Sequence, residues 1–202
     1  MTVAIIRNIQ LYRWSRFLRS LIFWQAVWFL YFQNVLSATE AILLYAVYDV
    51  ATTLLEVPSG YMSDRLGRKK TLIASAIAGL GGSFLLAIGD SFAVFAAGQV
   101  LIGASMAFAS GTDEAMLYES LAATGRADEI ETQEIIAWRY SFSALALSAL
   151  TGGALALIDP RLPFVGGALA FGGLFWITMR FVEPPRNSAT NEGCPLYTPT
   201  PP

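Results

Sequence analysis

Long apolar segments alternate with short polar connections along the chain. Six of these segments reach the roughly 18 residues that a helix needs to cross the hydrocarbon core of a bilayer. They cover approximately residues 18–36, 41–62, 71–89, 92–112, 136–158 and 162–182. Ser37 and Glu40 stand at the spacing of a capping box just before the second segment. The pattern predicts an all-α membrane protein with six transmembrane helices.

The two ends of the chain differ from this apolar pattern. Residues 1–17 mix large apolar side chains with arginines, which is typical of an amphipathic helix in the membrane interface. Residues 183–202 are polar and rich in proline, a composition typical of disorder. The expected organisation is therefore an interfacial segment over 1–17, a transmembrane bundle over 18–182 and a disordered cytoplasmic tail over 183–202.

Basic residues are distributed unevenly between the two sides of the predicted bundle. Of the 13 Lys and Arg residues, Arg139 lies inside a span and Arg161 falls on the side opposite the termini. The remaining eleven fall on the side of the termini. Since basic loops stay in the cytoplasm, we expect a multi-pass protein of the cytoplasmic membrane with both termini cytoplasmic.

The composition excludes several classes of function. The chain has no histidine, and Cys194 is its only cysteine, so an intramolecular disulfide, a His/Cys metal site and a His-dependent catalytic triad are excluded. The net charge of −2 gives no broad basic surface for nucleic acid. No group of carboxylates stands with a nucleophile. We therefore expect no enzyme activity, catalytic residue, metal, cofactor or nucleic-acid partner.

A charged stretch, SGYMSDRLGRKK, separates the second and third apolar segments. A loop that served topology alone would need basic residues but neither an aspartate nor two spaced glycines. A glycine permits close approach of a helix or a turn, an aspartate can meet a cation or a helix N-terminus, and arginines bind carboxylates bidentately. The pattern G-x-x-x-D-R-x-G-R-[RK] is formed by Gly60, Asp64, Arg65, Gly67, Arg68 and Lys69.

In spacing and location this stretch resembles the signature of the major facilitator superfamily. The similarity covers roughly residues 8–186 and includes ASGTDEAMLYESL and the closing EPPR. It implies the N-terminal six-helix half of a twelve-helix carrier, built as two three-helix repeats. Where drug–proton antiporters of the superfamily carry an arginine in the fourth helix, this chain has Gln99, and its fifth helix keeps TGG without the usual proline. Both departures weaken the expectation of drug–proton antiport.

Ionisable side chains within the spans are the candidates for ion coupling, because charges in hydrocarbon are costly. Asp49 lies near the middle of the second span, and Glu56 follows seven residues later on the same helix face. Glu56, Arg139 and Asp113 are expected to form a cytoplasmic-side charge network with the Asp64 loop. A static ion pair that only holds the helices is the alternative. Asp49, because of its depth, is the candidate for binding a proton or cation.

The first span carries aromatic and amide side chains. In the superfamily, the first and fourth helices line the central cavity, so the resemblance implies cavity contacts from this span. Packing against lipid or other helices is the alternative for its aromatic residues. The candidate cavity-lining residues are Trp28, Tyr31, Gln33 and Asn34.

Two functions follow from these expectations. The first is secondary active transport of a small molecule by alternating access, with proton coupling. The second is a truncated or half-length carrier chain without transport activity of its own, because six helices form one wall of the usual cavity and the sequence after Arg186 changes character. The expected partners are the lipid bilayer, an unidentified small-molecule substrate, and either a second six-helix half or a second copy of the chain.

Overall fold

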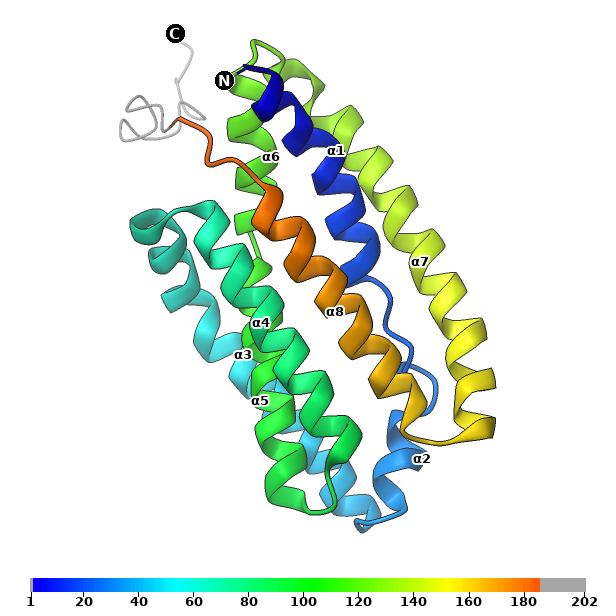
Figure 1. Ribbon diagram of the computed structural model, residues 1–202. Helices are drawn as coiled ribbons and strands as arrows, with labels where there is room; N and C mark the ends of the chain where they lie inside the picture. The colour runs from blue at the N-terminus through cyan, green and yellow to red at the C-terminus, as the bar shows by residue number, and fades with distance from the viewer. Residues whose placement is uncertain (1, 186–202) are drawn as a thin grey trace, which may run out of the picture.

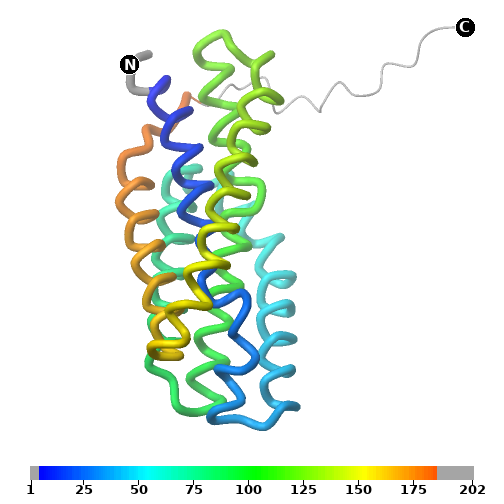
Figure 2. The backbone as a smooth tube through the Cα atoms, turned by 90° about the vertical axis from the view of Figure 1, so that its right-hand side faces the viewer, coloured from blue at the N-terminus to red at the C-terminus, as the bar shows by residue number. Residues whose placement is uncertain are grey.

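The computed structural model describes residues 2–185, with side chains from Ile5 onward, and this part of the chain contains helices and no strands. The helices lie side by side in an elongated bundle (Figures 1 and 2). Their bounds are α1 Thr2–Arg19, α2 Trp28–Gln33, α3 Ala38–Leu66, α4 Arg68–Ile88, α5 Phe92–Ala109, α6 Thr112–Ala122, a 3-10 turn Ala127–Glu129, α7 Ile130–Ile158 and α8 Leu162–Arg180.

Five helical stretches are long and apolar enough to cross a membrane. They are α3, α4, the combined stretch Phe92–Ala122 that contains α5 and α6, the stretch Ala127–Ile158 that contains α7, and α8. The predicted all-α membrane fold is therefore confirmed. A sixth crossing, by the first apolar segment, stays a prediction.

The first apolar segment is not one continuous helix, and the prediction of an unbroken span over 18–36 was wrong. Residues 20–27, SLIFWQAV, are turns and irregular backbone between α1 and α2; we call them the break segment. α1, the break segment and α2 follow one another along the length of the bundle (Figure 1). α1 continues past the boundary expected at residue 17 and buries Ile5, Ile9 and Tyr12. Placement of residues 1–17 in the membrane interface stays a prediction.

The helices pack in an order that brings the start of α1 and the residues that follow α8 to one end of the bundle. α4 packs against α5 and α8, α5 against α3, and α1 against α6, α7 and α8. The start of α1, the α3–α4 connection and residues 182–185 lie together there (Figure 1); we call it the motif end. The connections α2–α3, α4–α5 and α7–α8 lie at the opposite, far end.

Local sequence sets several helix ends. The side chain of Ser37 accepts a hydrogen bond from the Glu40 backbone N–H while the Glu40 carboxylate reaches back to the Ser37 N–H, so α3 begins with the capping box. Between α5 and α6, Gly111 adopts φ +69°, which glycine allows at little cost. α6 then continues the fourth apolar segment to Ala122. Residues 113–135, which separate the fourth and fifth apolar segments, are therefore mostly helical.

Candidate functional site

The break segment lies against glycines of two neighbouring helices. A Cβ at Gly152 of α7 would clash with the Phe23 carbonyl, and one at Gly167 of α8 would clash with the Trp24 ring. The absence of a side chain at these two glycines leaves room for the irregular backbone. Within residues 2–185, the N–H groups of Phe23, Trp24 and Ala26 donate to no backbone carbonyl. The tight fit on α7 and α8 explains how the irregular backbone keeps its place.

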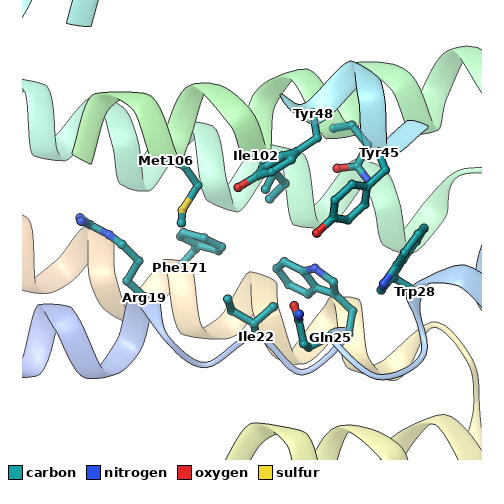
Figure 3. A pocket seen from close by; sticks show the side chains of 11 residues that line it. Arg19, Ile22, Gln25, Trp28, Tyr45, Tyr48, Ile102, Met106 and Phe171 are labelled. Atoms are coloured by element: carbon teal, nitrogen blue, oxygen red, sulfur yellow. The ribbon is translucent and has the colours of Figure 1, made fainter. Parts of the chain in front are cut away.

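A pocket of about 90 Å³ opens beside the break segment; we call it the central pocket. Trp28 packs on Tyr45 with ring centroids 4.9 Å apart, and Figure 3 shows these rings at one end of the pocket and Arg19 at the other. The lining is aromatic and apolar with two amides, a composition typical of small-molecule sites, whereas the volume is below the roughly 300–1,000 Å³ that such sites enclose. It consists of Arg19, Ile22, Trp24, Gln25, Trp28, Tyr45, Tyr48, Gln99, Ile102, Met106 and Phe171.

A second cavity, of about 420 Å³, adjoins the central pocket; we call it the charged cavity. Arg19, Tyr48 and Met106 line both cavities, so the two are neighbours beside α1, α3 and α5. The charged groups that border the second cavity are Arg16, Arg19, Glu56, Asp113 and Glu114.

One carboxylate joins two arginines at the wall of the charged cavity. Asp113 Oδ2 accepts hydrogen bonds from Arg16 Nη1 at 3.1 Å and Arg19 Nη1 at 2.9 Å. The side chains are 5% exposed for Asp113, 17% for Arg16 and 9% for Arg19. The Arg16 guanidinium also lies over the Trp138 ring, 4.9 Å from its centroid. Because the three charged groups are largely buried, their mutual pairing offsets the cost of removing them from water.

The motif end carries a separate polar cluster around the α3–α4 connection. Gly67 has φ +106°, and a Cβ there would lie 2.8 Å from Glu183 Oε1. The Glu183 carboxylate accepts the backbone N–H of Arg68 at 2.6 Å and of Lys69 at 2.9 Å. A carboxylate at a helix N-terminus satisfies otherwise unpaired donors and complements the helix dipole. The chain that follows α8 is thus attached to the start of α4.

Arg68 connects this cluster to two further helices. Its Nη1 donates to Asp64 Oδ1 and to Ser63 Oγ, each at 2.7 Å, at the end of α3. Its Nε and Nη2 both donate to Glu119 Oε1 of α6 at 3.1 Å. A single arginine therefore contacts α3 and α6 from the start of α4.

The other motif residues take less part in this cluster. Gly60 is exposed, and a Cβ there would meet nothing within 4 Å. The Arg65 guanidinium lies over the Tyr61 ring, 5.2 Å from its centroid. Lys69 contributes its backbone N–H to Glu183.

The candidate coupling residues are only partly brought together. Glu56 accepts a hydrogen bond from Ser110 Oγ at 3.2 Å and borders the same cavity as Asp113. Arg139 is exposed on α7 and forms no salt bridge within the part of the chain whose side chains are described. Asp49 is exposed on α3. Asp113 therefore pairs with α1, whereas the expected network included Arg139.

The candidate cavity residues separate in a similar way. Trp28 lines the central pocket. Tyr31 is buried, donates to the Leu86 carbonyl at 2.8 Å, and borders, with Asn34, another cavity at the far end. Gln33 is exposed.

Several site residues were missed in the sequence. Arg16 and Arg19 were counted only as topology-setting charges, although Arg19 falls within the first predicted apolar segment, 18–36. Tyr45 and Tyr48 were not predicted as site residues, although their spacing of three residues places them on the same face of a helix. Glu183 had a signal in the EPPR sequence, but its contact with α4 depends on the packing of α8.

A comparison with protein families agrees with this arrangement. A family model described as the Major Facilitator Superfamily matches residues 14–200. The match includes the break segment, both cavities and the α3–α4 motif. No curated protein matches the chain.

Proposed function

Because the chain belongs to the major facilitator superfamily of membrane transporters, we propose that it moves a small molecule across the cytoplasmic membrane by secondary active transport. The central pocket is the proposed substrate site. The motif end is the proposed cytoplasmic end, since the basic residues gather there.

The observation that carries this proposal is the break segment at the wall of the central pocket. Irregular backbone at membrane depth is tolerated where it is buried in protein or lines a cavity. Transporters of several folds bind substrates at such helix interruptions. Ile22, Trp24 and Gln25 of the break segment line the pocket, which supports a binding role for this interruption.

Alternating access and proton coupling form the second part of the proposal. The charged cavity is next to the central pocket and is lined by Glu56, Asp113 and Glu114. Asp113 already forms salt bridges with two arginines. Among the described side chains, the Glu56 carboxylate has only a serine hydroxyl as a hydrogen-bond partner. Glu56 is therefore the proposed proton-coupling residue. Asp49 is the second candidate because it lies on the same helix, nearer its middle.

A transport assay with an unbiased substrate mixture tests the proposal. The protein is reconstituted in liposomes, exposed to a mixture of small metabolites under an imposed pH gradient, and the vesicle contents are identified by mass spectrometry. We expect at least one compound to accumulate above the level of protein-free vesicles, and a protonophore to lower this accumulation.

Two variants localise the transport path. Met106→Trp fills the junction of the two cavities and is expected to abolish accumulation, because Met106 lines both. Leu169→Trp adds the same ring at a position that is 74% exposed on α8 and is expected to leave accumulation unchanged. If no compound accumulates, or if both variants behave as wild type, the proposed function is wrong.

A carrier unit that works only with a second six-helix unit is the other candidate. Large apolar side chains on α3 and α7 are exposed, among them Leu54 at 68% and Leu150 at 79%. Such faces fit either lipid or further helices. We propose a second six-helix half or a second copy of the chain as the partner. Intermolecular crosslinking between cysteines introduced at Leu54 and Leu150 tests the second copy, and its absence in membranes would exclude that partner.

A further inference from the structure

Gln99 of α5 carries a buried amide that has no partner. The residue is 8% exposed and lines the central pocket. Within the described part of the chain, neither atom of its side-chain amide makes a hydrogen bond, and neither is among the unpartnered atoms that are fully covered. Buried polar groups are almost always paired, because leaving them unpaired is costly. The amide of Gln99 is therefore open to the central pocket and lacks an acceptor and a donor there.

The pocket places a second amide opposite the first. Gln99, Ile102 and Met106 follow one another along a single face of α5, and all three line the pocket. On the other side, the amide of Gln25 points from the break segment toward Tyr45 of α3 (Figure 3). Gln25 is exposed, so the pocket is open beside it and a molecule larger than the enclosed volume can extend past it.

The aromatic part of the central pocket contains no free charge. Arg19 is the one charged residue of the lining, and its guanidinium points away from the rings (Figure 3) and donates to Asp113 at 2.9 Å. Glu56 and Glu114 line the charged cavity and do not line this pocket. An ion among the rings would lose its water without gaining an opposite charge, which is costly. The pocket therefore fits an uncharged molecule.

We propose that the transported substrate is a small uncharged compound with a primary amide, whose amide binds Gln99 and whose apolar part lies against Trp24 and Trp28. A glutamine side chain offers a carbonyl acceptor and an NH₂ donor. A primary amide of the substrate offers the same two groups, so that each amide donates one hydrogen bond to the other. This pairing satisfies the buried amide of Gln99. The inference rests on the proposed transport function and names its substrate class.

A sugar is the competing uncharged substrate. Its hydroxyl groups also donate and accept, and two of them could bind Gln99. However, a sugar carries hydroxyl groups on all sides, and each one that is buried without a partner costs free energy. Apolar atoms supply most of the surface of the central pocket. A molecule with one polar group and an apolar body is therefore the better fit.

Binding of four matched compounds tests the substrate class on the unmodified protein. Benzamide, benzoate and benzylamine carry the same ring with a neutral, an anionic and a cationic group. Acetophenone has the shape of benzamide but lacks its N–H donors. Affinities for the purified full chain are measured by equilibrium binding in detergent, with glucose as the sugar.

We expect benzamide to bind about tenfold or more tightly than each of the other compounds. The two ions would be desolvated without a counter-charge, and acetophenone would leave the carbonyl of Gln99 without a donor. Equal affinities, tighter binding of any other compound, or no binding of benzamide at millimolar concentration would overturn the proposal.

A pair of variants then tests the role of Gln99. Gln99→Leu removes both hydrogen-bonding groups of the side chain, so it is expected to abolish the tenfold preference for benzamide over acetophenone. Gln33→Leu is the control, because Gln33 is exposed on α2 and lines neither the central pocket nor the charged cavity. If Gln99→Leu keeps the preference, or if Gln33→Leu also loses it, the specific role of Gln99 is contradicted.

Gln99→Glu provides a second test that keeps the shape of the side chain. The carboxylate has no N–H donor and adds a negative charge to the pocket. We expect this variant to reverse the order of affinities, so that benzylamine binds more tightly than benzamide. An unchanged order in Gln99→Glu would show that the side chain does not contact the bound molecule.

The transport assay separates failure of this inference from failure of the proposed function. If the liposomes accumulate only ions or sugars and benzamide does not bind, the protein is a transporter and the substrate class is wrong. If nothing accumulates, the transport function itself fails. If uncharged amides accumulate and Gln99→Leu abolishes that accumulation while Gln33→Leu does not, both proposals are supported.

Discussion

Replacing Asp113 by Asn should destabilise the bundle strongly. The substitution removes the one carboxylate that faces both Arg16 and Arg19, and it leaves two guanidinium groups that are at most 17% exposed. Removing one partner of a buried ion pair typically costs about 3–5 kcal/mol. For a chain of this size, about 3 kcal/mol corresponds to a decrease in Tm of roughly 6–12 °C.

Asp64→Asn is the matched control for this measurement. Asp64 also pairs with an arginine, Arg68, but it is 69% exposed, and exposed pairs contribute about 0–1 kcal/mol. Its Tm should therefore fall by at most about 4 °C. Both variants are purified in the same detergent, and tryptophan fluorescence is followed during heating. If Asp113→Asn lowers the Tm no more than Asp64→Asn does, the reasoning from burial is refuted.

Three further predictions test other parts of the molecule. Gly152→Ala should lower the free energy of unfolding by about 1–3 kcal/mol, because its Cβ would clash with the Phe23 carbonyl. Gly153→Ala, whose Cβ would meet nothing within 4 Å, should leave the free energy of unfolding unchanged. Equal Tm values for the two variants would contradict the described packing. Glu183→Gln should lower the free energy of unfolding by about 1 kcal/mol through loss of charge at the α4 N-terminus. High salt should reduce the difference in Tm between this variant and the wild type. Glu56→Gln should leave membrane insertion intact and remove the dependence of transport on a pH gradient; normal gradient dependence would exclude Glu56 from coupling.

The helical framework was predictable because it depends on local sequence. Uninterrupted apolar runs determine where α3, α4, α5 and α8 lie, and the Ser37 and Glu40 pair determines where α3 begins. The residue types of the α3–α4 motif likewise identified the family, which the match over residues 14–200 confirms.

The break in the first span could not be predicted from its own residues. The sequence SLIFWQAV contains neither glycine nor proline, so its local preferences do not indicate an interruption. The interruption matches spaces left by Gly152 and Gly167, which are more than 120 residues away in the sequence. Tertiary packing of this kind overrides local propensity.

The arginines that pair with Asp113 could not be predicted for the same reason. Asp113 and Arg16 are separated by 97 residues, and an arginine that sets topology has the same sequence signal as one that forms a buried pair. Arg139 appeared equally suitable because it lies inside a predicted span. Only the arrangement of α1 beside α6 distinguishes the two.

The break segment also has a mechanical consequence. α1 packs against α6, α7 and α8, whereas α2 packs against α3. A continuous helix would transmit a tilt of one half directly to the other. An interruption leaves α1 and α2 without a continuous helical hydrogen-bond ladder between them, so each helix is held by its own neighbours in the bundle. A molecule bound in the central pocket would therefore touch α1, α2 and the interruption at once, because Arg19, Trp28 and the break segment all line that pocket.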